Sequence, residues 1–315
     1  AKRVLRCKDS EIKSIELHRK SIDARKKRDV HFILSFRVEL TSPHLEREAV
    51  DSVSERDRSR VRAIEDDGSS FPTPVSDAPQ ERPVVVGAGC AGLFAALTLA
   101  EAGLKPLLIE RGDPAFRRSH AIDLFLKERI LDPESNIQFG LGGAGTFSDG
   151  KLTTRIGDEL CGFVTEVFLE HGAPKEIAWQ QKPHVGTDLL RGVITSIRKE
   201  IESLGGEVHF NTALTGFERR DGQLVGIQTT DGAFPCEALV FAVGHSARDT
   251  FGMLMDSGLV LECKPFSVGF RAEHLQSEIE KSLYHEAAGH PALPRGEYQL
   301  SKHVEKRCVY TFCMC

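Results

Sequence analysis

The sequence has no apolar run of the roughly 18 residues that a membrane-spanning helix needs. Its most apolar stretch, AGLFAALTLAEAGL, is interrupted by Glu101 and predicts a buried helix instead. An excess of basic residues is also lacking, since the formal net charge is -5 and the isoelectric point is about 6.2. This balance gives no reason to expect a protein that binds nucleic acid over its whole surface. The N-terminus has neither a methionine nor the apolar core of a secretory signal.

No CxxC pair occurs among the eight cysteines. Scattered cysteines in a chain of this length indicate reduced thiols, and hence a reducing compartment such as the cytoplasm or the plastid stroma. The last two form the single close pair, without further Cys or His at zinc-ligand spacing, so no metal site is predicted. The eight are Cys7, Cys90, Cys161, Cys236, Cys263, Cys308, Cys313 and Cys315.

The remaining composition is ordinary for a globular protein, with 40% hydrophobic and 28% charged residues over 315 positions. Changes in amino-acid composition along the chain predict three regions. Residues 1–50 form a small N-terminal α/β domain, and residues 51–81, rich in charge, serine and proline, form a flexible linker. Residues 82–315 form the main domain, with an inserted flap that faces the substrate.

Within the N-terminal domain, DSEIKSIELHRKSI has helical spacing and DVHFILSFRVEL predicts a strand. The basic run RKSIDARKKRD lies between them. It is explained by a solvated helix end, where lysine and arginine favour the dipole, or by a patch that docks RNA or another acidic surface. The first explanation is favoured, because no aromatic residues are interleaved with the basic ones.

The main domain opens with PVVVGAGCAGLFAALTLAEAGLKPLLIERG, which predicts a strand, a glycine turn, a helix and a second strand. Ala96 and Gly103 are small, as a helix close to a sheet requires. Farther on, TDLLRGVITSIRKEIESLGG predicts an amphipathic helix that ends at Gly205 and Gly206. Its apolar stripe comprises Leu190, Val193, Ile194, Ile197, Ile201 and Leu204.

Strand-like runs follow at EVHFNT, LTGFER, LVGIQT and LVFAVG, with Asp-Gly turns at 221–222 and 231–232. This order predicts a β-meander inserted between two strands of a parallel sheet. The expected fold class is therefore α/β: a Rossmann-like, three-layer domain with an inserted β-meander, plus the small N-terminal α/β domain.

Gly87, Gly89 and Gly92 fit the pattern G-x-G-x-x-G between the first strand and its helix. In a dinucleotide site, the first glycine permits the tight turn, the second admits the pyrophosphate and the third lets the helix pack closely. The N–H groups at the helix start, from Cys90 and Ala91 onward, would then face the phosphates. Glu110 ends the second strand about 20 residues on, where a carboxylate binds the ribose.

The fingerprint leaves FAD and NAD open. A second G-x-G-x-x-G after a strand is lacking downstream, and LVFAVGHSARD ends a strand at Ala242 and Gly244, where a flavoprotein sheet returns to its cofactor. Both features favour FAD.

These stretches resemble the glutathione-reductase-like superfamily of FAD-binding folds. Most closely they resemble a poorly characterised family of FAD-dependent dehydrogenases found in bacteria and plastids. The resemblance is carried by SIDARKK, VVVGAGCAGLFAALTLAEAG, ERG, NIQFGLGGAGTFSDGKLTTR, AVGHSARDTF and KPFSVGFRAEH, which are spread over nearly the whole chain except the linker. In that family the chain continues past FCMC, which implies that this sequence is a C-terminally truncated fragment.

The resemblance also implies that GLGGAGTFSDGKL passes close to the flavin and its pyrophosphate. Its glycines would follow the cofactor closely, its hydroxyls would donate to it, and Asp149 and Lys151 would lie near the flavin ring or the substrate entrance. The alternative for the last two is a local turn and a surface ion pair. The candidate cofactor-binding residues are Gly87, Gly89, Cys90, Ala91, Gly92, Glu110, Arg111, Gly142, Gly143, Gly145, Thr146, Ser148, Lys151, Ala213, Ala242 and Gly244.

The expected function is that of an FAD-dependent oxidoreductase with an unknown small-molecule substrate and NADH or NADPH as a candidate donor. Three alternatives remain: a flavoprotein tethered to RNA, a flavin-binding scaffold without turnover, and an enzyme that uses NAD alone. No membrane or nucleic-acid partner is expected. A general base is not assigned; candidates by residue type alone are Lys151, His184, His245, Arg271 and His274.

Overall fold

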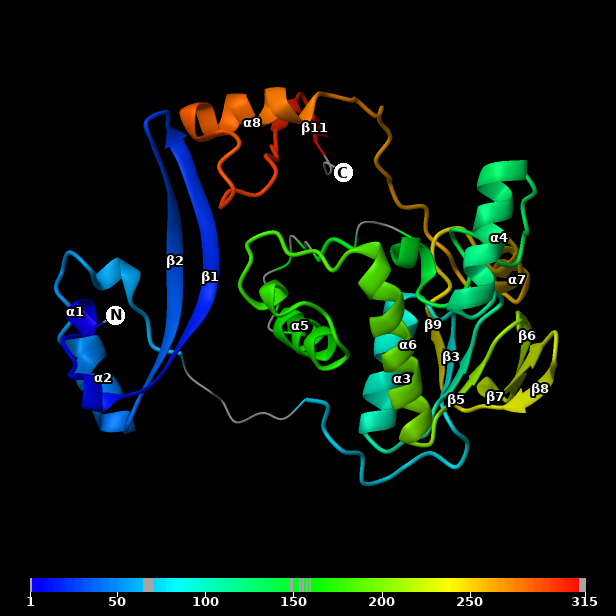
Figure 1. The fold of residues 1–315 in the computed structure, drawn as a ribbon. Coiled ribbons are helices and arrows are strands. Elements are labelled where there is room, and N and C mark those ends of the chain that lie inside the picture. Colours follow the sequence, from blue (N-terminus) through cyan, green and yellow to red (C-terminus); the bar gives the residue numbers. More distant parts are fainter. Residues whose placement is uncertain are drawn as a thin grey trace. The chain divides into compact units, whose positions relative to one another are not determined.

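The computed structural model of the chain describes residues 2–64, 71–147, 150–152, 154, 156, 158 and 160–311. They form two compact units (Figure 1). Unit 1 comprises Ala1–Asp66, Ala178–Gln181 and Lys264–Cys315, and unit 2 comprises Asp67–Ile177 and Lys182–Cys263. The chain from Lys264 onward, assigned from the sequence to the main domain, is thus grouped with the N-terminal segment. In the described part, no helix is long and apolar enough to cross a membrane.

Unit 1 contains a long antiparallel hairpin of β1 (Ile12–Lys26) and β2 (Asp29–Leu40). The helix predicted over the first segment is therefore wrong. Leu17 lies opposite Phe36 in this hairpin, and such cross-strand pairs stabilise a strand although local spacing does not reveal them. The basic run lies around the hairpin turn at 27–28, not at a helix end.

The other elements of unit 1 are short. A serine, Ser42, caps α2 by accepting a hydrogen bond from the N–H of Leu45 at 3.4 Å. The last strand of unit 1 ends at Tyr310, and residues 312–315 lie outside the described chain. The elements are α1 (Lys2–Leu5), η1 (Asp9–Glu11), α2 (Pro43–Asp51), η2 (Arg58–Arg60), α8 (Gln276–Tyr284), η5 (His285–Ala287), β10 (Ser301–Val304) and β11 (Arg307–Tyr310).

A four-stranded parallel sheet forms the middle layer of unit 2, in the order β5–β4–β3–β9. Every residue of the two inner strands is buried, as expected for a parallel sheet covered on both faces. The strands are β3 (Val84–Val86), β4 (Leu107–Ile109), β5 (Glu207–His209) and β9 (Leu239–Phe241).

Helices α3 (Cys90–Glu101) and α6 (Thr187–Ser203) cover one face of this sheet (Figure 1). The amphipathic helix predicted for α6 is confirmed, except that Leu204 falls just beyond its end and is 36% exposed. Ala96 is fully buried, as expected. Gly103 is a glycine for a different reason from the predicted one. A Cβ there would meet nothing within 4 Å, but α3 ends at this residue with a φ of +87°, in the left-handed region that favours glycine.

The opposite face carries the predicted meander of β6 (Leu214–Arg220), β7 (Gln223–Thr229) and β8 (Gly232–Pro235). Its first turn has positive φ angles at both Asp221 (+52°) and Gly222 (+84°), as a two-residue hairpin turn requires. Because this meander lies between β5 and β9 in the sequence and forms its own layer, the predicted three-layer Rossmann-like fold is confirmed.

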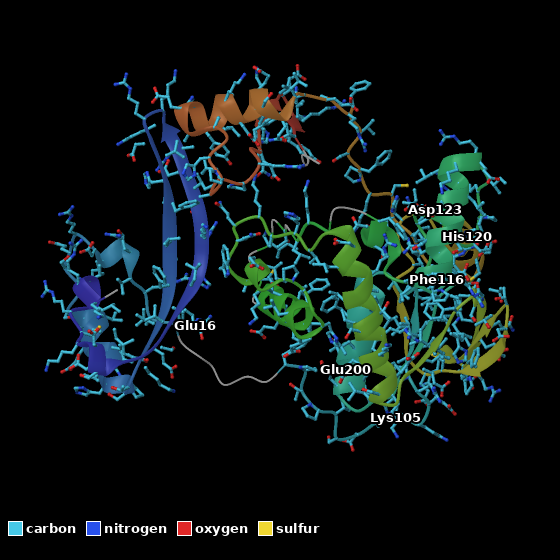
Figure 2. The ribbon with its side chains drawn as sticks, viewed as in Figure 1. Glu16, Lys105, Phe116, His120, Asp123 and Glu200 are labelled. Carbon is cyan, nitrogen blue, oxygen red and sulfur yellow. The ribbon has the colours of Figure 1, made fainter. Side chains whose placement is uncertain are left out.

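The remaining elements of unit 2 are helical, and the first of them, α4, follows the carboxyl end of β4, the edge of the sheet at which open α/β folds bind their ligands. Helix α4 turns Phe116, His120 and Asp123 toward solvent (Figure 2), whereas Arg118 and Ile122 are buried on its other side. These elements are α4 (Ala115–Glu128), η3 (Gly143–Phe147), α5 (Leu160–Glu170), η4 (Lys175–Ala178) and α7 (Arg248–Asp256).

Candidate cofactor site

The turn after β3 is packed so tightly that two of its glycines have no room for a side chain. Gly87 has a φ of +98°, and a Cβ on it would lie 2.5 Å from the carbonyl oxygen of Ala242. A Cβ on Gly92 would lie 1.8 Å from the carbonyl oxygen of Gly87. These two positions therefore fix the turn against β9 and hold α3 close to it.

The middle glycine of the fingerprint differs, because a side chain there would meet only an ordinary van der Waals contact. Gly89 is the N-cap of α3, and the nearest atom to a Cβ on it would be the Cα of Gly143, at 3.8 Å. No side chain of the described residues caps this helix. Cys90 and Ala91, which begin α3, are exposed. The first turn of α3 thus presents N–H groups and a positive dipole end, which together suit an anion.

A second glycine-rich loop lies directly against this turn. The N–H of Gly142 donates to the carbonyl oxygen of Ala88 at 2.7 Å, and a Cβ on Gly143 would lie 3.0 Å from the Cα of Gly89. Thr146 is fully buried, and its hydroxyl donates to the carbonyl oxygen of Leu141 at 3.1 Å. In this structure the Thr146 hydroxyl therefore stabilises the conformation of the loop through a hydrogen bond within it.

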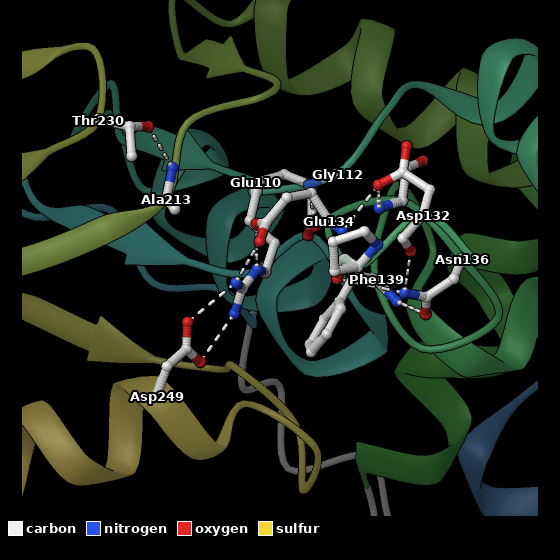
Figure 3. A network of polar contacts seen from close by, with 12 residues as sticks. Glu110, Gly112, Asp132, Glu134, Asn136, Phe139, Ala213, Thr230 and Asp249 are labelled. Carbon is white, nitrogen blue, oxygen red and sulfur yellow. Dashed lines mark hydrogen bonds and ion pairs between the residues drawn. The ribbon is translucent and has the colours of Figure 1, made fainter. Parts of the chain in front are cut away.

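Glu110 lies at the carboxyl end of β4 and is 4% exposed (Figure 3). Its Oε2 accepts from the N–H of Ala88 at 2.7 Å, and its Oε1 accepts from the N–H groups of Gly112 and Gly140, both at 2.9 Å. A carboxylate offers about four lone-pair positions, so one position on Oε2 is left. The side chain ties the first glycine turn to the second glycine-rich loop.

Arg111, a predicted cofactor ligand, pairs with the carboxylates of Glu134 and Asp249, both of which are labelled in Figure 3. Its guanidinium donates to Glu134 through Nε at 2.8 Å and Nη2 at 2.9 Å, and to Asp249 through Nη1 and Nη2, both at 2.9 Å. The ring of Phe139 lies 4.6 Å from its Cζ. The two carboxylates raise the pKa of Arg111 and lower that of Asp249. Arg111 thus joins the loop after α4 to α7.

Arg118 was not predicted, yet its side chain is buried beneath the second glycine-rich loop. Its guanidinium donates hydrogen bonds to main-chain carbonyls of residues 136–143 and stacks 4.8 Å from the ring of Phe147. Burial lowers the pKa of Arg118 to about 10, and the charge of Glu110 opposes this shift. The available signal in the sequence was its position four residues before Ile122, on the inward side of α4.

Other candidates lie around the same loops. The N–H of Ala213 donates to the Thr230 hydroxyl at 3.0 Å (Figure 3). Lys151 forms an antiparallel bridge with His184, and Nε2 of His245 lies 3.3 Å from the Ser246 hydroxyl.

Four predicted positions lie in less constrained surroundings or in the other unit. A Cβ on Gly145 or Gly244 would meet nothing within 4 Å. Arg271 and His274 belong to unit 1. Ser148 and Asp149 lie outside the described residues.

Together these features fit a dinucleotide. The three fingerprint glycines have three different environments that suit a pyrophosphate-binding turn: a tight left-handed turn at Gly87, only an ordinary van der Waals contact at Gly89 and close packing at Gly92. The donors are backbone N–H groups at a helix N-terminus, and the acceptor is a carboxylate at the end of the neighbouring strand.

Comparison with known families assigns three parts of the chain. Residues 82–152 match the FAD binding domain family, and residues 265–315 match the family described as FAD-dependent protein, C-terminal domain-like. Residues 1–39 match a domain of unknown function. The two FAD families identify FAD as the cofactor, which decides between FAD and NAD. The last two matches fall in unit 1 and the first in unit 2.

The chain is 44% identical over 309 residues to an uncharacterized protein of Clostridium beijerinckii. The alignment covers 97% of this chain and 56% of the relative, so the chain spans little more than half the length of that protein. Among solved structures, it is similar to THI4 of Thermovibrio ammonificans, with 17% identity and a TM-score of 0.36 over 57% of this chain and 64% of that one. It is also similar to glycine oxidase of Bacillus cereus, with 11% identity and a TM-score of 0.35 over 51% of this chain and 56% of the other.

Proposed function

We propose that unit 2 holds FAD by its ADP half between two glycine-rich loops, and that the chain is part of an FAD-dependent oxidoreductase. One observation carries the proposal. The loop at Gly143 touches the turn at Gly89 backbone to backbone, beside the uncapped start of α3. Because both segments are glycine-rich and carry few side chains here, their backbones can approach a pyrophosphate at the helix N-terminus closely.

In this proposal the N–H groups of Cys90 and Ala91 bind the phosphates. Glu110 accepts a ribose hydroxyl through the lone-pair position that remains on Oε2, while its other three positions hold the loops. The site is thereby formed before the cofactor arrives, which reduces the cost of ordering it on binding.

When bound, FAD supplies the redox chemistry, because its ring accepts a hydride or electrons and passes them to a second acceptor. The chain's own task is to bind and orient the cofactor. Lys151 and His184 are our candidates for the substrate side, because their backbones pair just after the second glycine-rich loop. The substrate class and the catalytic acid or base are not assigned.

Two steps test the proposal. The purified chain is titrated with FAD, and the bound complex is then reduced without oxygen by NADH and, separately, by NADPH. We expect about one FAD per chain, and reduction by one of the two donors faster than that of free FAD. A chain that binds no FAD contradicts the proposal. A complex that neither donor reduces faster than free FAD favours a scaffold, unless another donor is found.

The RNA-tethering alternative gains no support from the basic hairpin turn. Arg25 in this run is paired with Asp23, with its Nε 2.9 Å from Oδ1 of that carboxylate. Asp23 thus offsets one positive charge of this run. We therefore propose no nucleic-acid role for unit 1.

A further inference from the structure

The guanidinium of Arg118 has five N–H donors, and the structure gives each of them a main-chain carbonyl. Nε donates to Asn136 at 2.8 Å. Nη1 donates to Leu141 at 2.7 Å and, more weakly, to Gly140 at 3.4 Å. Nη2 donates to Ile137 at 2.9 Å and to Gly143 at 2.7 Å. One side chain thus binds the carbonyls of five of the eight residues 136–143.

None of the five hydrogen-bond partners of the Arg118 guanidinium is a carboxylate. Arg118 is 0% exposed. Its charge is stabilised by the carbonyl dipoles, by the ring of Phe147 and, without a direct contact, by the charge of Glu110. A buried charge is costly unless such partners stay in place. The charge therefore holds the five carbonyls in their converging arrangement.

This arrangement places the loop that faces the fingerprint turn. Gly143, whose carbonyl Arg118 binds, lies against Gly89. Gly142, the residue before it, donates its N–H to Ala88 at 2.7 Å. A shift of the carbonyls would move both glycines relative to the start of α3.

We propose that Arg118 is a positioning residue for the cofactor site, acting through the main chain of residues 136–143 without touching FAD. This inference rests on the proposed function, because it assumes that FAD binds between the two glycine-rich loops. It extends that function by assigning the geometry of the second loop to one buried side chain on α4. Lysine cannot replace it fully, because an ammonium has three donors and no planar fork.

The test compares Arg118→Met and Arg118→Lys with Arg117→Met, a matched control at the exposed neighbouring position. Thermal melting of the FAD-free chains first defines a temperature at which all are folded. FAD is then titrated at that temperature, and the visible circular dichroism of the bound flavin is recorded. We expect the Kd for FAD to rise about tenfold or more in Arg118→Met, to rise less in Arg118→Lys, and to stay unchanged in Arg117→Met. We also expect an altered dichroism band at saturating FAD in the two Arg118 variants.

An Arg118→Met chain that melts at a lower temperature but, while folded, binds FAD as tightly as the control overturns the inference. That result would leave the proposed function intact, whereas an unmodified chain that binds no FAD would contradict the proposed function itself. If neither Arg118 variant folds, hydrogen exchange of the unmodified chain decides. FAD should then slow exchange in residues 136–143 together with the start of α4, and unchanged exchange there would contradict the inference.

Discussion

Glu110 and Arg118 bind the two ends of the same residue. The N–H of Gly140 donates to Oε1 of Glu110 at 2.9 Å, and the carbonyl oxygen of Gly140 accepts from Nη1 of Arg118 at 3.4 Å. Gly140 has a φ of +108°, and a Cβ on it would lie 2.5 Å from Cδ of Arg118. Two buried, oppositely charged side chains from β4 and α4 thus fix the start of the second glycine-rich loop.

Replacing Gly89 by aspartate should abolish FAD binding and leave the fold largely intact. The side chain has space in the FAD-free chain, because the nearest atom to its Cβ would be 3.8 Å away. Its carboxylate would then repel the pyrophosphate. FAD per chain after desalting measures the effect, with Gly162→Asp as control because Gly162 lies in α5 with nothing within 4 Å of its Cβ. A Gly89→Asp chain that keeps about one FAD would refute the assignment of the pyrophosphate site.

Gly92→Ala should destabilise the chain itself, in contrast to the Gly89 variant. Its new methyl group would lie 1.8 Å from the carbonyl oxygen of Gly87, so α3 must shift at a cost of about 1–3 kcal/mol. Gly162→Ala, in open space on a helix, should instead stabilise by about 0.5–1 kcal/mol. Urea midpoints of the two variants should move in opposite directions. Equal midpoints would show that the close packing of the turn does not limit stability.

Glu110→Gln should lower both stability and FAD affinity. The amide cannot accept from three N–H groups with the same strength, and its own NH2 faces one of them. We expect a loss of at least about 1.5 kcal/mol in the free energy of unfolding, the value of one hydrogen bond to a charged group. Denaturant unfolding of the FAD-free chain measures this, with Glu101→Gln at the exposed end of α3 as control. Should Glu110→Gln unfold like the control, the carboxylate does not hold the loops.

The ion pair of Arg111 and Asp249 predicts a pH dependence with a definite sign. Hydrogen bonds from Arg111 lower the pKa of Asp249 in the folded chain. A carboxyl with a lowered folded pKa stabilises above its unfolded value, about 3.9, and loses that contribution as the pH falls through the folded pKa. The carboxylate of Asp249 is 64% exposed, so the contribution should be about 1 kcal/mol or less.

The measurement compares the unfolding free energies of the unmodified chain and Asp249→Asn between pH 3 and pH 7. Their difference should be constant near neutral pH and shrink below about pH 4. Asp256→Asn, at the end of the same helix and outside this ion pair, serves as the control. A difference that grows as the pH falls would contradict the predicted sign.

Local patterns predicted the parts of the fold that local chemistry determines. The fingerprint at Gly87, the stripe of α6 and the Asp-Gly turn of the meander all depend on neighbours in the sequence, and each was found where expected. The strand β1 was missed because its partners lie across the hairpin, where the turn at 27–28 carries no glycine or asparagine.

The role of Arg118 could not be predicted for a related reason. Its partners are carbonyls 18 to 25 residues away along the chain, and main-chain carbonyls have no signature in a sequence. An arginine in an amphipathic helix is usually placed in solvent. The three hydrogen bonds that the Glu110 carboxylate accepts could likewise not be predicted from the sequence, although its place at the end of β4 was predicted.

Equilibrium titration with FAD, ADP and FMN tests the central claim most directly. If the two glycine-rich loops hold the cofactor by its ADP half, FAD should bind at about one per chain, ADP should compete with it, and FMN, which lacks the ADP half, should not. Gly89→Asp should abolish the binding of both FAD and ADP. FMN binding as tight as that of FAD, or FAD binding that ADP does not compete with, would contradict the claim.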